Sequence, residues 1–159
     1  MITNDNNQTA FTTAGNVERT NLLKMYAHIG VTNYTFTDST GYDRVEGYFT
    51  TPNGTKYVVE AKCRQGKVNQ YPDHLIEKKK YDVLAGYLKD GYTPLYVNFF
   101  NDGNTIVYNL TKRINTNTIS WKVQKCKSTT AVHGKYIDKE IGFLQIDTTM
   151  GDKIITDLE

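Results

Sequence analysis

The sequence predicts a mixed α/β domain in which helices cover a central sheet. Segments with helical and strand periodicity alternate from residue 16 to residue 110, in the order helix, three strands, helix, two strands. The 159 residues are 38% hydrophobic and 23% charged, a composition typical of a folded chain with its own core. We therefore expect a flexible segment over residues 1–15 and a single domain over 16–159, with its core over 16–110 and a basic C-terminal extension over 111–147.

The first expected elements are a helix and three strands. Asn16 is a suitable N-cap and Gly30 a suitable stop, so we expect a helix from Asn16 to about Ile29. Aromatic and β-branched residues then alternate with polar ones in three segments, over residues 34–36, 42–51 and 57–64.

The second half of the chain continues the alternation of helices and strands. A second helix is expected from Pro72 or Asp73 to about Lys89. Two strands joined by an Asp102-Gly103 turn follow it, over residues 94–100 and 105–110. Residues 119–123 alternate as in a strand. Residues 137–146 fit either a strand or a short helix.

Charge and cysteine content favour an intracellular chain with nucleic acid as a candidate partner. The net charge is only +2, but basic residues gather late in the chain, at Lys112, Arg113, Lys122, Lys125, Lys127, Lys135 and Lys139. Such a band suits a phosphate backbone, and it suits an ordinary solvated surface equally well. Cys63 and Cys126 lack metal-ligand spacing and fit reduced thiols. With no apolar run that could span a bilayer and no signal-peptide core, we expect no membrane association and a cytoplasmic location, in the host cell if the chain is phage-encoded.

The candidate catalytic residues lie on the third expected strand. Because side chains alternate between the faces of a strand, Glu60 and Lys62 share one face of an otherwise apolar segment. A cross-strand ion pair on an exposed face is the ordinary explanation of such a pair. With Asp43 of the preceding strand, however, Glu60 and the backbone carbonyl of Ala61 offer the oxygen ligands that Mg²⁺ prefers. Lys62 would then position or deprotonate the attacking water and offset negative charge.

Asp43, followed after a β-hairpin by Glu60-Ala61-Lys62 and then a helix, resembles the PD-(D/E)XK nuclease superfamily of restriction-endonuclease-like and junction-resolvase-like proteins. The resemblance implies a restriction-endonuclease-like αβββαβ core, with a central mixed sheet flanked by helices. It also implies Mg²⁺-dependent cleavage of DNA, with Mn²⁺ as a substitute, and makes Glu18 of the opening helix a catalytic, metal-side carboxylate. A glutamate at that place is otherwise a helix-dipole partner. The sequence departs from the family in having Tyr42, not proline, before Asp43.

Further residues are expected to support the site or to contact DNA. Lys80 lies between Ile76 and Leu84 on the inward face of the second helix, an unusual place for a lysine unless it reaches an anion. Glu77 and Tyr81 stand where one exonuclease branch of the superfamily has Gln-x-x-x-Tyr, with glutamate in place of glutamine. Along the DNA we expect residues of the late basic stretch, namely Trp121, Lys122 and Lys125.

The turn Pro52-Asn53-Gly54 decides whether Asp43 reaches the face of Glu60. A two- or four-residue loop places Asp43 on the face that Glu60 and Lys62 share. Pro52 instead favours a three-residue loop with Gly54 as the bulge residue, and that register turns Asp43 away. If the three-residue loop is present, we predict a second bulge between Asp43 and Gly47, which would return Asp43 to the shared face.

The expected function is that of a small metal-dependent DNA endonuclease, a phosphodiester hydrolase of phage or mobile-element type. Its size also suits a homodimer that cuts both strands. Two alternatives remain open: a non-catalytic DNA-binding module on the same fold, and a protein-binding accessory factor whose basic strip is ordinary surface. Mg²⁺-dependent cleavage separates the first alternative from a nuclease, and the salt dependence of DNA binding separates the second from the first.

Overall fold

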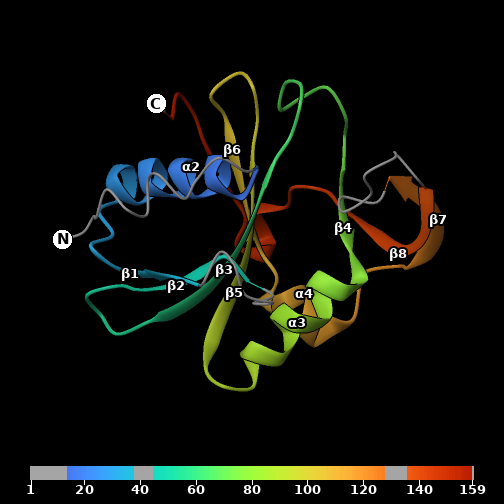
Figure 1. Ribbon diagram of the computed structural model, residues 1–159. Coiled ribbons are helices and arrows are strands. Elements are labelled where there is room, and N and C mark those ends of the chain that lie inside the picture. Colours follow the sequence, from blue (N-terminus) through green and yellow to red (C-terminus); the bar gives the residue numbers. More distant parts are fainter. Residues whose placement is uncertain (1–13, 38–44, 128–135, 159) are drawn as a thin grey trace.

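The computed structural model describes residues 14–37, 45–127 and 136–158, which form a mixed α/β structure with two sheets. The larger sheet has the strand order β1-β2-β3-β5-β6-β9, and the smaller has the order β4-β8-β7 (Figure 1). β3 runs parallel to β5, and the other neighbouring strands are antiparallel. The strands are β1 (Asn33–Phe36), β2 (Gly47–Thr50), β3 (Lys56–Cys63), β4 (His74–Glu77), β5 (Tyr92–Phe99), β6 (Thr105–Asn109), β7 (Lys122–Lys127), β8 (Tyr136–Leu144) and β9 (Lys153–Ile155).

Helices cover both faces of the larger sheet. α2 (Ala14–Ile29) packs on one face, and α3 (Lys78–Leu88) packs on the other, beside the smaller sheet (Figure 1). α4 (Thr111–Thr116) follows β6, and the 3-10 turn η1 (Thr148–Met150) precedes β9. Within the described part of the chain, none of the helices has the length and apolar character needed to cross a membrane.

Two hydrophobic clusters form because the side chains of β3 alternate between the two faces of the sheet. Val59 packs toward α2, in a cluster with Leu22. Val58 packs on the opposite face, in a cluster with Leu84 of α3. The even-numbered residues of β3 therefore face α3, so Glu60 and Lys62 share that face as the alternation predicts.

The second helix begins later than the sequence predicts. It starts at Lys78, not at Pro72 or Asp73, and the preceding residues form strand β4. β4 pairs with β8, which lies far along the chain, and this long-range pairing overrides the local helix signal of Pro72. Ile76, expected on the inward face of the helix, is fully buried on this strand instead.

Other boundaries shift less. α2 begins at Ala14, two residues before the expected Asn16 cap, because alanine favours helix and helix ends move easily. Gly30 ends that helix with φ of 79°, as predicted. The ambiguous segment over 137–146 is largely strand β8, whereas α4 and β9 were not predicted.

Gly47 packs where a side chain has no room. A Cβ at this position would lie closer to the backbone carbonyl oxygen of Thr35 than real Cβ atoms come. Gly47→Ala should therefore lower the free energy of unfolding by about 1–3 kcal/mol or more. Gly86→Ala, at an exposed position of α3 where an added Cβ meets no atom within 4 Å, should instead raise it by about 1 kcal/mol. Urea unfolding tests both changes, and a Gly47→Ala protein as stable as the natural one would contradict the expected clash.

A buried ion pair joins the C-terminal segment to the larger sheet. Arg113 and Asp152 are 5% and 3% exposed, and their two contacts, Nη2 to Oδ2 and Nη1 to Oδ1, measure 2.6 and 2.9 Å. Asp152 also accepts hydrogen bonds from the backbone amides of Asn109 and Asp147. Arg113 donates further bonds to the carbonyls of Asn109 and Gln145. The pair thus holds together α4, the end of β6 and the segment before β9.

Candidate active site

β3 presents Glu60 and Lys62 just beyond the point where β2 stops pairing with it. The β2–β3 ladder ends at the Gly47–Val59 pair, and β3 continues beside β5 as far as Cys63. Glu60 is only 7% exposed, and Lys62 is half-buried. A buried carboxylate is costly unless it is paired or bound to a cation, so this end of β3 is the candidate functional site.

The hairpin between β2 and β3 has the register that Pro52 favours. Phe49 pairs with Tyr57, and Thr51 and Thr55 close the turn with a backbone hydrogen bond of 3.0 Å. Gly54 adopts φ of 88°, the left-handed conformation of a bulge residue in a three-residue loop. In a regular strand this register would turn Asp43 away from the face of Glu60.

The second bulge that this register requires is present at Glu46 and Gly47. Gly47 is the ladder partner of Val59, yet the amide of Glu46 also bonds to the Val59 carbonyl at 2.8 Å. Val45 packs in the cluster on the α3 side and Phe49 in the cluster on the α2 side, although a regular strand would place both on one face. Two residues opposite one, with a reversal of faces, define a β-bulge.

Lys80 of α3 reaches the Glu60 carboxylate, as its inward position predicts. The Nζ–Oε2 distance is 2.5 Å. Burial raises the pKa of Glu60 above its usual value, and the attraction of Lys80 only partly opposes this shift. Partial burial alone would lower the pKa of Lys80, but the charge of Glu60 and its hydrogen bond to Lys80, together with the charges of Glu77 and Glu46, outweigh it, and the pKa lies above its usual range. The two groups thus hold each other in place across the face of the sheet.

A pair of carboxyl groups, those of Glu18 and Glu46, lies on the side of the sheet that α2 covers. Glu18 is hydrogen-bonded to Glu46, whose carboxylate also contacts Arg19 Nε at 3.6 Å. Burial, followed by repulsion from Glu46, raises the pKa of Glu18 to about 7. Because α2 begins at Ala14, Glu18 lies beyond its first turn, and the helix-dipole explanation of this residue loses its basis.

Lys62 lies close enough to Glu18 for its charge to lower the pKa of that carboxyl, against the larger effect of burial. Within the described ranges, no carboxylate forms an ion pair with Lys62. This half-buried ammonium group near Glu18, without an ion-pair partner among the described residues, can bind an incoming anion.

The described residues by themselves do not complete a metal-binding group. Over residues 14–37, 45–127 and 136–158, no three His, Cys, Asp or Glu side chains come together closely enough to hold a metal ion. Asp43, the third expected ligand, lies outside the described residues. The backbone amide of Ala61 bonds to the Glu60 carboxylate. The donor chemistry nevertheless suits Mg²⁺, since crowded, buried carboxyl groups with raised pKa values are relieved by a divalent cation.

Apart from Lys80, the residues expected to support the site or to contact DNA lie around α3 and on the smaller sheet. Glu77 forms an ion pair with Lys139 at 3.0 Å, on the side of the smaller sheet. Tyr81 is buried and packs edge-on against Trp121, with 4.9 Å between ring centroids, so both rings belong to the packing beneath α3. The two expected DNA-contacting lysines are exposed on β7, Lys122 above the ring of Phe143 and Lys125 paired with Asp138.

Sequence reasoning missed Arg19 and Glu46 as members of the site. Both are largely buried, with side chains 8% and 13% exposed. In a regular strand over residues 42–51, alternation places Glu46 on the face opposite Val45 and Phe49, where a solvent-exposed charged residue is expected. The signal that could have revealed it is the following Gly47, since a glycine inside a strand often marks a bulge.

Comparisons with protein-family models, with curated proteins and with solved structures found no match to this chain.

Proposed function

We propose that this chain is a Mg²⁺-dependent deoxyribonuclease that hydrolyses DNA phosphodiester bonds at the end of β3. The observation that carries the proposal is that buried Glu60 and half-buried Lys62 share one face of β3, with Glu18 of α2 close to Lys62. The order α2, β1, β2, β3, α3, β5 supports a PD-(D/E)XK nuclease core into which β4 is inserted. The bulge at Gly47 supports it as well, because bulges are common beside active sites.

Each residue has a distinct role in this proposal. Glu18, Asp43, Glu60 and the Ala61 carbonyl would hold the cation. Bound Mg²⁺ would polarise the phosphate and lower the pKa of a water molecule. Lys62, as an ammonium group, would orient that water and stabilise the charge that develops on the phosphate, while the proton of the water passes to bulk solvent. The charge of Lys80 favours the ionised form of Glu60 against the effect of burial and holds the carboxylate in place.

The direct test is incubation of the protein with circular and linear DNA in the presence of Mg²⁺, Mn²⁺ or EDTA. We expect nicked and linearised circles with either metal and intact DNA with EDTA. Cleavage of linear molecules alone would identify an end-dependent enzyme of the same class. Intact DNA under every metal condition, with protein that is shown to be folded, would reject the proposal.

A second candidate is a non-catalytic DNA-binding module. The observation that favours it is that Glu60 and Glu46 already have cationic partners in Lys80 and Arg19, as in a structural ion-pair cluster. DNA binding would then be the same with Mg²⁺ and with EDTA, and no nicking would occur. Its affinity would still fall steeply with salt, because phosphate contacts release counterions.

The raised pKa of Glu18 predicts how stability depends on pH. Its pKa is about 7 in the folded protein against 4.5 for an ordinary glutamate, so the folded state holds the proton more tightly. The contribution to stability is complete below about 4.5 and is lost as the pH rises through about 7. Glu18→Gln should therefore be more stable than the natural protein at pH 8 in EDTA and show little gain at pH 4.

Urea unfolding at the two pH values, with EDTA present, measures this difference. Glu140→Gln, at an exposed position of β8, is the matched control and should change stability little at either pH. A Glu18→Gln protein that gains nothing between pH 4 and pH 8 would contradict the raised pKa.

A further inference from the structure

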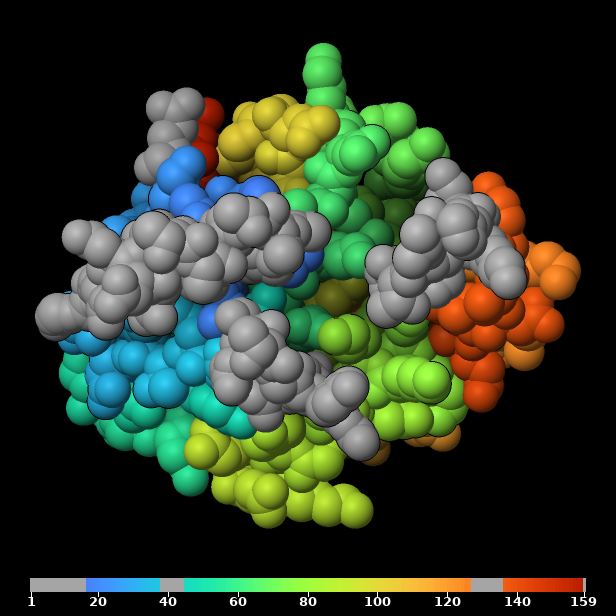
Figure 2. All heavy atoms as spheres, in the orientation of Figure 1, coloured from blue at the N-terminus to red at the C-terminus, as the bar shows by residue number. Residues whose placement is uncertain are grey.

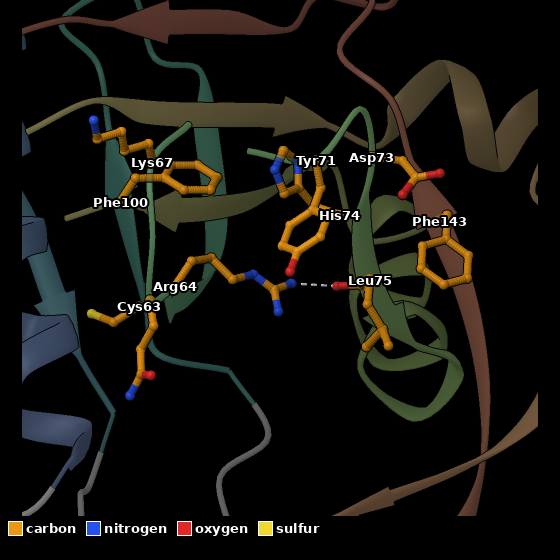
Figure 3. Close-up of a pocket in the computed structure, with 10 residues that line it drawn as sticks. Cys63, Arg64, Lys67, Tyr71, Asp73, His74, Leu75, Phe100 and Phe143 are labelled. Carbon is orange, nitrogen blue, oxygen red and sulfur yellow. Dashed lines mark hydrogen bonds between the residues drawn. The ribbon is translucent and has the colours of Figure 1, made fainter. Parts of the chain in front are cut away.

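A pocket of about 440 Å³ lies immediately beyond the Glu60–Lys62 pair, between the end of β3 and β4. In Figure 2 the atoms of the segment after β3 and of the segment leading into β4, both green, stand on either side of a recess. Figure 3 shows Arg64 extending across this space from the end of β3 toward Leu75 of β4. A volume of this size is typical of a site for one small ligand.

Arg64 is held in the pocket by three hydrogen bonds to uncharged groups of the described residues. It continues the row of Glu60 and Lys62, since alternate residues of a strand share a face and lie roughly 6.6 Å apart. Its guanidinium donates to Asn98 Oδ1 at 2.6 Å, to the Tyr96 hydroxyl at 3.0 Å and to the Leu75 carbonyl. No carboxylate among the described residues forms an ion pair with it. A cation fixed by neutral partners is prepared for an anionic ligand.

The other lining residues add one cation, one anion and two exposed rings. Lys67 also lines the pocket, although Figure 3 shows its ammonium group directed away from the Arg64 guanidinium, and Asp73 supplies the only carboxylate that the structure describes in the lining. His74 contributes no charge at neutral pH, because burial and the nearby Arg64 lower its pKa. Tyr71 and Phe143 are 61% and 40% exposed, so both rings are accessible to a ligand. Cations beside exposed rings are the elements of a single-stranded nucleic-acid site.

We propose that this pocket holds one unpaired nucleotide of the DNA strand, next to the phosphate that is cleaved. The nucleotide's phosphate would lie on Arg64, and its base would stack on Tyr71 or Phe143. Because the pocket accommodates one nucleotide and not a base pair, the substrate is a DNA with a single-stranded segment, such as an overhang or flap. This inference rests on the proposed nuclease function and specifies its substrate.

Fluorescence anisotropy tests the pocket without cleavage. The Lys62→Ala protein in EDTA is titrated with a labelled blunt duplex and with the same duplex carrying a single-stranded overhang. We expect tighter binding of the overhang by roughly fivefold or more, the effect of one stacked base and one phosphate contact. Tyr71→Ala and Arg64→Gln, each added to Lys62→Ala, should remove this preference while changing blunt-duplex binding much less.

Tyr71 is exposed, so its variant tests the site even if Arg64→Gln weakens the fold. Lys79→Gln, at an exposed position of α3, is the charge-matched control and should keep the preference. Equal binding of both DNAs would overturn the pocket assignment, and so would a preference that survives both Tyr71→Ala and a folded Arg64→Gln. If the natural protein still cleaves DNA, either result leaves the nuclease proposal standing. Absence of both cleavage by the natural protein and DNA binding would instead reject the nuclease proposal.

Discussion

Replacing Lys62 with alanine is expected to lower the rate of Mg²⁺-dependent DNA cleavage by about a hundredfold or more. Lys62 shares a face with Glu60, lies near Glu18 and has no ion-pair partner among the described residues. Its removal breaks no ion pair among the described residues, because Glu60 keeps Lys80. The folded structure should persist while the group that handles water and phosphate charge is lost. Conversion of supercoiled plasmid measures the rate, and circular dichroism measures folding.

Lys56→Ala is the matched control for this experiment. Lys56 lies on the same strand and the same face as Lys62, but at the exposed end, where Nζ sits 4.7 Å from the Tyr92 ring centroid. Its loss should leave cleavage unchanged, which separates a local role of Lys62 from a general effect of positive charge. If Lys62→Ala cleaved DNA as fast as the natural protein, Lys62 would have no catalytic role.

Replacing Asp152 with alanine is expected to cost about 3–5 kcal/mol of folding free energy, because it leaves the Arg113 guanidinium buried without a counter-charge. It also removes the acceptor for the backbone amides of Asn109 and Asp147. Since a whole domain is typically stable by about 5–15 kcal/mol, the variant should unfold at markedly lower urea concentration. The change lies far along the chain from Glu60, so it tests the architecture and not the chemistry.

Asp138→Ala provides the comparison for the buried pair. Asp138 and Lys125 form an ion pair of 3.3 Å between side chains that are 62% and 76% exposed. Such a surface pair contributes about 1 kcal/mol at most. If Asp152→Ala were no more destabilising than Asp138→Ala, the Arg113–Asp152 pair would not be the connection that holds the C-terminal segment.

Local patterns predicted those parts of the site that depend on a single element. Alternation along residues 57–64 was enough to place Glu60 and Lys62 on one face, and the structure has them there. The inward position of Lys80 on its helix predicted an anionic partner, which is Glu60. The proline at position 52 favoured the three-residue turn and, through its register, a bulge before Gly47, where the bulge is found. Each of these depends on residues close in sequence.

Long-range pairing decided what the sequence pattern could not. β4 is a strand because β8 pairs with it, although Pro72 locally favours a helix. Glu46 joins Glu18 only because the bulge reverses its face and α2 crosses that face of the sheet. The gathering of Arg64 and Tyr71 around one pocket likewise depends on the position of β4, which lies in the smaller sheet across the pocket from the end of β3.

The sequence by itself determined the mixed α/β class, the face that carries Glu60 and Lys62, and the turn that sets their hairpin, because periodicity and turn chemistry act over a few residues. Only the tertiary structure decided the second sheet, the burial of Arg113 with Asp152, and the carboxyl pair of Glu18 and Glu46. These arrangements depend on contacts between distant segments, whose free energy arises only when the whole chain packs.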